Sequence, residues 1–139
     1  MGEKPNILLD GKSLLTRDEI NMSPEQISPA SLAYIGDVVY ELYIRSYYLL
    51  PAQRISAYHK QVVTQVRAET QAQHLRSLQI YLSDEEKEIL KRGRNAATKK
   101  PRRLPLSIYQ KATSLETLIG YLYLSNPERL QEIFNYLEL

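Results

Sequence analysis

Two acidic residues, Asp37 and Glu116, stand out because each lies in a stretch that is otherwise apolar or aromatic. An ionised carboxylate is costly to bury unless a cation or hydrogen bonds compensate its charge. Each acid also has a glycine close by: Gly36 precedes Asp37, and Gly120 follows Glu116 by four residues, on the same helical face. Because glycine has no side chain, another backbone can approach closely at both places, and the two segments can cross there.

A crossing of this kind predicts a site for a hard divalent cation. Two carboxylates a few ångströms apart stay ionised together only when a cation lies between them. Magnesium or manganese suits such oxygen ligands, can orient a water molecule and stabilises charge on a phosphate in transfer. The absence of cysteine, with only His59 and His74 as histidines, argues against zinc. The residues alone leave a structural interpretation open, in which Arg45, Lys111 or a tyrosine hydroxyl neutralises the acids.

A basic segment at 91–103 contains seven Lys or Arg residues and no acid, although the net charge of the whole chain is only +2. No aromatic residue is interleaved with these charges, which argues against stacking on single-stranded bases and favours contacts with backbone phosphates. A solvated basic loop without a ligand is the alternative. His59 and Lys60 can likewise be read as phosphate contacts or as exposed side chains, and His74 as structural.

The elements that carry these residues are predicted to be helices, because their apolar residues recur at helical spacing and no stretch alternates as a strand does. Ser28 with Pro29, Ser83 with Glu86, and Asn126 with Pro127 have the form of helix starts, and Gly93 and Pro51 are expected to end helices. The first long helix is expected to be buried on nearly all sides. The predicted helices cover 24–28, 29–50, 56–78, 84–93, 107–124 and 127–137.

Length and composition predict a single all-α domain at 23–139, preceded by a flexible arm at 1–22. The sequence contains no apolar run of bilayer length and no secretory leader, so we expect no membrane partner and a cytoplasmic location. The absence of cysteine excludes disulfides and fits a reducing compartment. No motif for a nucleotide cofactor is visible.

Three motifs, in order and at the expected spacing, closely resemble the Mini-ribonuclease III family. They are LAYIGD with VYE at 32–41, KRGRNA at 91–96 and LETLIGYLYL at 115–124. This family is the ribonuclease III catalytic domain without an appended double-stranded-RNA-binding domain. The pair His59-Lys60 and the stretch VRAETQ at 66–71 are also similar to the family's second long helix.

The resemblance implies an all-α helical bundle of the ribonuclease III endonuclease-domain type that forms a homodimer. It further implies a Mg²⁺-dependent endoribonuclease, with Mn²⁺ as a substitute, that cleaves double-stranded RNA and leaves 5′-phosphate and 3′-hydroxyl ends. Bacterial members of the family trim the precursor of large-subunit (23S) ribosomal RNA, which makes this precursor the expected partner.

Residue by residue, the resemblance makes Asp37 and Glu116 the catalytic acids and metal ligands. Full-length ribonuclease III has further acids where this chain has Ala33 and Thr113, as the Mini type does, which implies more water around the metal. Glu41 and Thr113 are candidates for a supporting role, although Glu41 can instead pair with Arg45. The candidate RNA-binding residues are His59, Lys60, Lys91, Arg92, Arg94, Lys99, Lys100, Arg102 and Arg103.

Two other functions compete with this hypothesis. A non-catalytic module on a ribonuclease III scaffold would bind double-stranded RNA without cutting it. A purely structural helical dimer would use Arg45 or Lys111 to neutralise the acids and would bind neither metal nor RNA.

Overall fold

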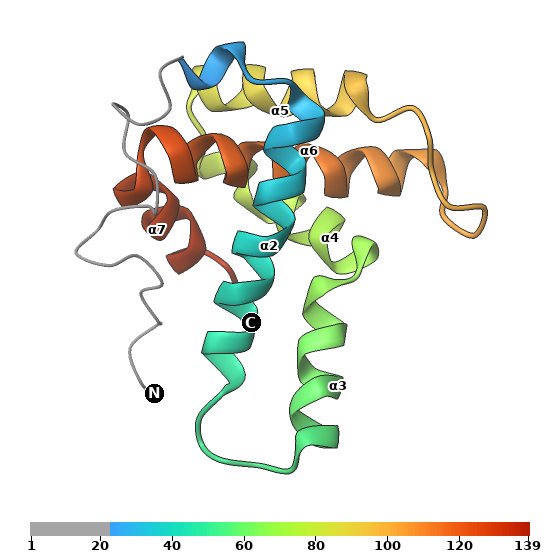
Figure 1. The fold of residues 1–139 in the computed structure, drawn as a ribbon, viewed down its shortest axis with the longest axis vertical. Helices are drawn as coiled ribbons and strands as arrows, with labels where there is room; N and C mark the ends of the chain where they lie inside the picture. Colours follow the sequence, from blue (N-terminus) through green and yellow to red (C-terminus); the bar gives the residue numbers. More distant parts are fainter. Residues whose placement is uncertain (1–22) are drawn as a thin grey trace.

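The computed structural model describes residues 23–139, so the predicted arm at 1–22 lies outside the described residues. Within 23–139 all regular secondary structure is helical, which confirms the predicted all-α fold (Figure 1). Among these residues, no helix combines the length and the apolar character needed to cross a membrane. The elements are η1 (Pro24–Gln26), α2 (Pro29–Tyr48), α3 (Ile55–Val66), α4 (Ala68–Leu78), η2 (Gln79–Tyr81), α5 (Asp84–Ala96), α6 (Leu106–Ser125) and α7 (Pro127–Asn135).

The core is built around two 20-residue helices, α2 and α6, which cross each other in the upper half of the molecule (Figure 1). Helices α4, α5 and α7 also pack on α6, and the lower half of α2 extends below the body as a hairpin with α3. The predicted caps are present: Ser28 Oγ accepts a hydrogen bond from Ser31 N, and Asn126 Oδ1 accepts one from Arg129 N.

Glycines set the spacing of the α2–α6 crossing. A Cβ atom added to Gly36 would lie 1.8 Å from the backbone oxygen of Glu116. A Cβ atom added to Gly120 would lie 1.9 Å from the backbone oxygen of Leu32. Each helix therefore places a glycine against the other's backbone, as the sequence predicted, and no larger residue fits at either position without moving a helix.

The predicted single helix at 56–78 is wrong, because the chain divides at Arg67 into α3 and α4. Arg67 adopts an extended conformation with ψ 154°, which interrupts the helical hydrogen bonds. Polar side chains satisfy the carbonyl groups released by the break. Thr70 Oγ1 donates to the Thr64 oxygen at 2.5 Å, and Gln71 Nε2 donates to the Val66 oxygen at 2.8 Å.

Gly93 does not end α5, which continues to Ala96. A Cβ atom at Gly93 would lie 2.5 Å from Thr117 Oγ1 and 3.1 Å from Ser114 Cα, so this glycine allows α5 to approach α6. The residue acts through packing between helices rather than as a terminator.

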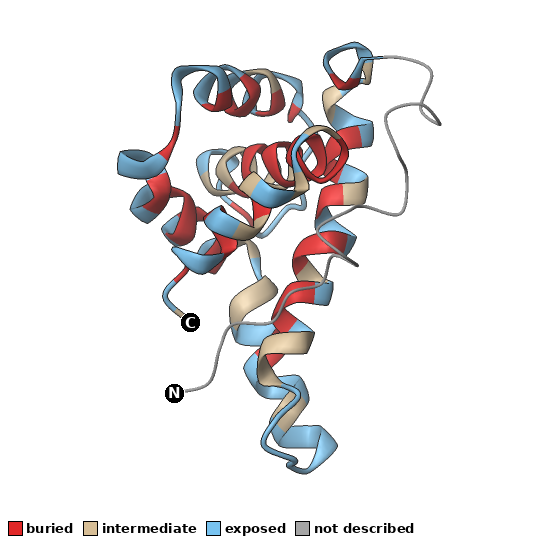
Figure 2. Ribbon diagram, turned by 90° about the vertical axis from the view of Figure 1, so that its left-hand side faces the viewer, coloured by how far each residue is buried: buried red, intermediate tan, exposed pale blue. Residues whose placement is uncertain are grey.

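The expectation that α2 is buried on nearly all sides is also wrong. Tyr34, Val38 and Leu42 recur every four residues along one face, and their exposed fractions are 83%, 64% and 50%. The opposite face is buried, so the helix alternates between buried and exposed surface along its length (Figure 2). The exposed face is an apolar stripe, defined here as Tyr34, Val38 and Leu42.

A buried ion pair connects α5 to α7. Glu86 is only 6% exposed, and its two oxygens accept hydrogen bonds from Arg129 Nε at 2.8 Å and Nη2 at 3.0 Å. The capping box of α5 adds a third bond, from Ser83 N to Glu86 Oε1 at 2.9 Å. Burial by itself would raise the pKa of Glu86, but the bonds from Arg129 and Ser83 lower it below its ordinary value.

Candidate active site

A cavity of about 260 Å³ lies at the α2–α6 crossing, where the end of α5 closes one side. Asp37 of α2 and Glu116 of α6 both line it, so the structure brings the two predicted acids together. Thr113 lies one turn before Glu116 and lines the same cavity. The other lining residues are Pro29, Ala30, Ala33, Tyr34, Gly93, Ala96 and Tyr109.

The glycine contact itself explains why the two acids meet. The backbone oxygen that faces Gly36 belongs to Glu116, and Asp37 is the next residue on α2. One of the two close glycine contacts between the helices therefore lies beside the acids. Small residues keep the space around them open, since Ala33, Gly93 and Ala96 present little or no side chain to the cavity.

The electrostatics of the pair show that its charges repel. Burial and the adjacent Asp37 carboxyl raise the pKa of Glu116 to about 8 from the ordinary value of 4.5. Near neutral pH the pair therefore retains a proton unless a cation takes its place. Among the ion pairs of residues 23–139, none includes Asp37 or Glu116.

Arg45 and Lys111, which the sequence analysis considered as neutralising partners, form no ion pair with these acids. Arg45 pairs with Glu41 at 3.0 Å, which is the alternative that the sequence left open for Glu41. Lys111 forms no ion pair within the described part of the chain. The structure therefore gives no support to an acid pair held by Arg45 or Lys111.

The donor set of the cavity fits a hard divalent cation. Its polar side chains are two carboxylates and the hydroxyl groups of Thr113, Tyr34 and Tyr109, all of them oxygen groups, and sulfur and imidazole are absent from its lining. No group of three or more His, Cys, Asp or Glu side chains in residues 23–139 could hold a metal ion. A cation here would therefore have to complete its coordination with water and substrate oxygens.

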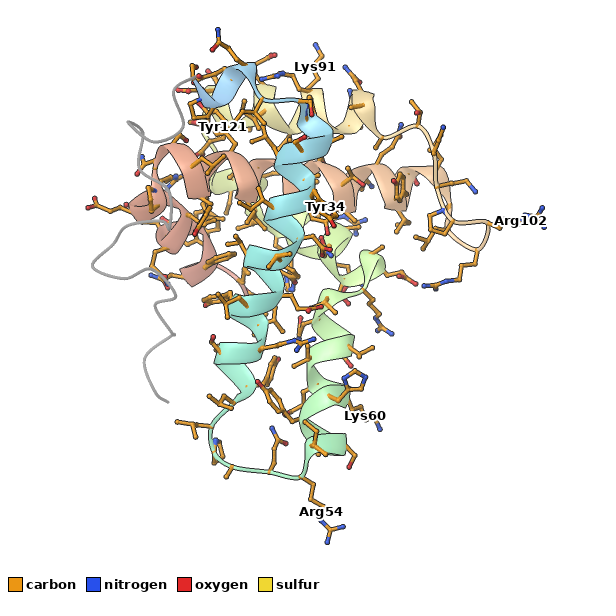
Figure 3. The ribbon with its side chains drawn as sticks, in the orientation of Figure 1. Tyr34, Arg54, Lys60, Lys91, Arg102 and Tyr121 are labelled. Carbon is orange, nitrogen blue, oxygen red and sulfur yellow. The ribbon has the colours of Figure 1, made fainter. Side chains whose placement is uncertain are left out.

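The candidate RNA-binding residues do not form one cluster. Lys99, Lys100, Arg102 and Arg103 are exposed on the loop between α5 and α6, and Lys91 and Arg94 are exposed on α5. In Figure 3 Arg102 extends from the loop and Lys60 from α3 on the same side of the molecule, whereas Lys91 lies on the outer side of α5.

Some of these candidates have other contacts. Arg92 donates from Nη2 to the Glu25 backbone oxygen at 3.1 Å, so part of its side chain holds η1 against α5. His59 is exposed on α3, and His74 is buried, with its ring Nε2 3.1 Å from Gln65 Oε1. His74 therefore has the structural surroundings that the sequence predicted for it.

Two tyrosines that the sequence analysis did not single out also line the cavity. Tyr34 precedes Asp37 by three residues, and Tyr109 precedes Thr113 by four, so helical spacing could have identified both. Gln71 of α4 also contacts Glu116, and its hydrogen bond acts to lower the pKa of that carboxyl. No local signal in the sequence pointed to this glutamine.

Comparisons with known proteins agree with this architecture. A family model described as the ribonuclease III domain matches residues 30–127. A Mini-ribonuclease 3 from Thermosynechococcus vestitus is 51% identical over 94% of this chain and 86% of its own length. One from Synechocystis is 53% identical over 83% and 80%, and one from Clostridium tetani is 42% identical over 78% and 75%. A crystal structure of a Fusobacterium nucleatum protein superposes with a TM-score of 0.75 at 34% identity, covering 83% of this chain and 95% of that one.

Proposed function

Since this chain belongs to the ribonuclease III domain family and is an endoribonuclease of that type, we propose that it cleaves double-stranded RNA with Mg²⁺ held by Asp37 and Glu116. Mn²⁺ would substitute because it has the same preference for oxygen ligands. The catalytic unit is residues 23–139. The observation that carries the proposal is the convergence of two carboxylates in one cavity, without a basic partner among the described residues.

The two acids have different surroundings, and we assign their roles accordingly. Asp37 is exposed, so its carboxylate faces the side from which RNA arrives. Glu116 is more buried and needs a positive charge nearby to remain ionised at neutral pH. A divalent cation held by Asp37 and Glu116 would supply that charge, and its chemistry when bound would be to activate a water molecule and to stabilise negative charge on the phosphate. We assign Thr113, which lines the cavity, the role of a hydrogen-bond donor to the site.

Exposed basic side chains would hold the RNA backbone. The loop between α5 and α6 adjoins the cavity through Ala96 at one end and Tyr109 at the other. We propose that Lys99, Lys100, Arg102 and Arg103 contact phosphates, together with Lys91, Arg94, His59 and Lys60. If about four to six side chains each neutralise a phosphate, log affinity should fall with log salt at a slope of roughly −3 to −5.

We also propose that the active form is a homodimer joined through the apolar stripe. Tyr34, Val38 and Leu42 are too exposed to contribute to the core of one chain. The stripe runs beside Asp37 on α2, so a two-fold axis through it would bring two cavities to one surface. Two such sites facing one duplex would cut both of its strands.

The proposed natural substrate is the precursor of 23S ribosomal RNA. The support for it is the similarity to proteins named Mini-ribonuclease 3, together with the bacterial processing role that the resemblance implies. Mapping the 5′ ends produced when the purified protein is incubated with this precursor tests the assignment. We expect new 5′ ends only in paired regions near the termini of the mature RNA. Random nicking along the precursor would contradict the assignment.

A cleavage assay tests the reaction and the site together. A long RNA duplex is incubated with Mg²⁺ and with one of four proteins: wild type, Asp37→Asn, Glu116→Gln or the control Glu128→Gln. The control removes an exposed acid of α7. Losing a metal ligand should slow cleavage by about 10³-fold, equivalent to about 4 kcal/mol of transition-state stabilisation, whereas the control should cut normally. Equal rates in all four proteins would refute the site. Duplex binding without any nicking, in Mg²⁺ or Mn²⁺, would indicate a non-catalytic module.

A further inference from the structure

The active-site cavity is lined by three hydroxyl groups that the described chain does not use internally. They belong to Tyr34, Tyr109 and Thr113. Within residues 23–139, none of these three hydroxyls forms a hydrogen bond. Tyrosines that pack elsewhere in the fold differ, because their hydroxyls donate to oxygens of the chain: Tyr40, Tyr43, Tyr58 and Tyr121. A tyrosine that is partly buried usually finds such a partner, so the hydroxyls of the cavity are available to a ligand.

Tyr109 is the hydroxyl that the proposed function leaves unassigned. Tyr34 is 83% exposed and belongs to the apolar stripe, and Thr113 is already given a role beside the acids. Tyr109 lies in the first half of α6, and its side chain is partly buried against the cavity wall. Packing restrains its ring, and its polar end has no partner in the described part of the chain. Such a group is prepared in advance to bind.

The position of Tyr109 relative to Glu116 suits a contact with the same RNA strand. Tyr109, Thr113 and Glu116 follow at intervals of four and three residues, so they share one face of α6. Seven residues of helix span about 10 Å. A nucleic-acid strand advances roughly 3 Å per nucleotide along the axis of its duplex. A strand whose phosphate lies at Glu116 therefore passes Tyr109 within about three nucleotides.

The chemistry of the cavity favours the ribose as the group that Tyr109 contacts. The lining residues include no Lys or Arg for a direct phosphate contact, and no Asn or Gln to read the edge of a base. A tyrosine hydroxyl both donates and accepts a hydrogen bond, as the 2′-hydroxyl of RNA does. Double-stranded RNA displays its 2′-hydroxyls in a wide, shallow minor groove that side chains can reach.

We propose that Tyr109 determines specificity for RNA: its hydroxyl forms a hydrogen bond with the 2′-hydroxyl of one ribose close to the scissile phosphate. The enzyme would then distinguish ribose from deoxyribose at that nucleotide. This inference rests on the proposed function, and it adds a substrate contact that involves neither the cation nor the basic side chains.

Paired changes in the protein and in the RNA test this contact. Wild type and Tyr109→Phe cleave, with Mg²⁺, duplexes that carry a single 2′-deoxynucleotide at each position within about three nucleotides of the cut. Tyr109→Phe should lower kcat/KM for the all-ribose duplex by about 5- to 10-fold, as expected for one neutral hydrogen bond. At one position, the deoxynucleotide should lower kcat/KM of wild type by the same factor. It should leave Tyr109→Phe unaffected, because both changes remove the same bond.

Tyr136→Phe is the matched control. Tyr136 follows α7, is 39% exposed and lies outside the cavity lining, so this variant should cleave every duplex as wild type does. Thermal unfolding then separates substrate binding from folding. Tyr109→Phe should unfold at the temperature of wild type, since its hydroxyl has no partner within residues 23–139. A clearly lower midpoint would show that the chain itself uses this hydroxyl, and would overturn the proposal.

The set of substrates distinguishes this inference from the function on which it rests. If Tyr109→Phe cleaves the all-ribose duplex as fast as wild type, only the contact is wrong. The contact is also wrong if the variant is slower by one factor on every duplex, which would indicate a phosphate contact or a structural role. If wild type cuts no duplex in Mg²⁺ or Mn²⁺, or if Asp37→Asn cuts as well as wild type, the proposed site is wrong. The role of Tyr109 then fails with it.

Discussion

Glu86 and Glu116 are both withdrawn from solvent, but their surroundings are opposite. Glu86 accepts two hydrogen bonds from Arg129 and one from Ser83, and its pKa is lowered. Glu116 faces another acid, Asp37, and its pKa is raised to about 8. The first arrangement satisfies a charge within the chain. The second leaves a repulsion that a bound proton or a cation relieves, which makes the pair a candidate binding site.

The difference also shows which observation identifies function. Burial alone does not, because Glu86 is the more buried of the two acids. The decisive property is what lies opposite the carboxylate: a guanidinium in one region and a second carboxylate beside an open cavity in the other. Three changes test this contrast.

Arg129→Met should have the largest effect, because it leaves the charge of Glu86 buried without its partner. We expect a loss of about 3 kcal/mol in the free energy of unfolding at neutral pH, measured by urea denaturation. Glu132→Gln is the control, since it removes only the exposed ion pair of Arg129 and should cost less than about 0.5 kcal/mol. Similar losses in both variants would mean that Glu86 is not held as the structure indicates.

Gly36→Ala should have the next largest effect, on both stability and the site. The new Cβ atom would lie 1.8 Å from a backbone oxygen, so α2 and α6 must separate, at a cost of about 1–3 kcal/mol. The separation also moves Asp37 away from Glu116, so Mn²⁺ binding should weaken. Ala33→Gly, one turn earlier on α2, controls for a change of residue size near the cavity. A Gly36→Ala protein with unchanged stability and metal affinity would contradict the described crossing.

Glu116→Gln should have the smallest effect on the free energy of unfolding, and it should stabilise the protein rather than destabilise it. Because the folded pKa of about 8 exceeds the ordinary 4.5, the folded chain keeps a proton that the unfolded chain loses between these values. The metal-free protein should therefore lose stability as pH rises from 4.5 to 8. Removing this carboxyl should raise stability at pH 8 by about 1–2 kcal/mol, less than the full shift implies because solvent in the open cavity screens the repulsion, with little change near pH 4.5. Urea unfolding in a chelator at both pH values measures this, and a destabilised variant at pH 8 would contradict the repulsion.

The sequence predicted the features that depend on local chemistry. Proline and capping residues defined the starts of α2, α5 and α7, and glycines beside acids predicted the close crossing and the meeting of Asp37 with Glu116. Each of these follows from a short segment, where spacing along the chain fixes spacing in the structure. The family resemblance added the reaction, which no periodicity could supply.

Features that depend on tertiary contacts could not be predicted in this way. The break at Arg67 has neither proline nor glycine, and it is stabilised by side chains of Thr70 and Gln71 that also read as ordinary helical residues. The continuation of α5 through Gly93 depends on its neighbour α6. The exposed stripe of α2 resembles a buried face in sequence, because its residues are as apolar as those of a core and only the packing of the other helices decides which face of α2 is covered.

The paired glycines at the helix crossing have one more consequence. They set the spacing of the two backbones beside Asp37 and Glu116 through main-chain atoms, which do not change rotamer, so we expect side-chain substitutions elsewhere in the core to alter this spacing little. If the pair holds a cation as proposed, a laboratory that wished to retune it toward a larger or smaller ion would gain little by reshaping the surrounding side chains. It would have to redesign the two helical backbones as a unit.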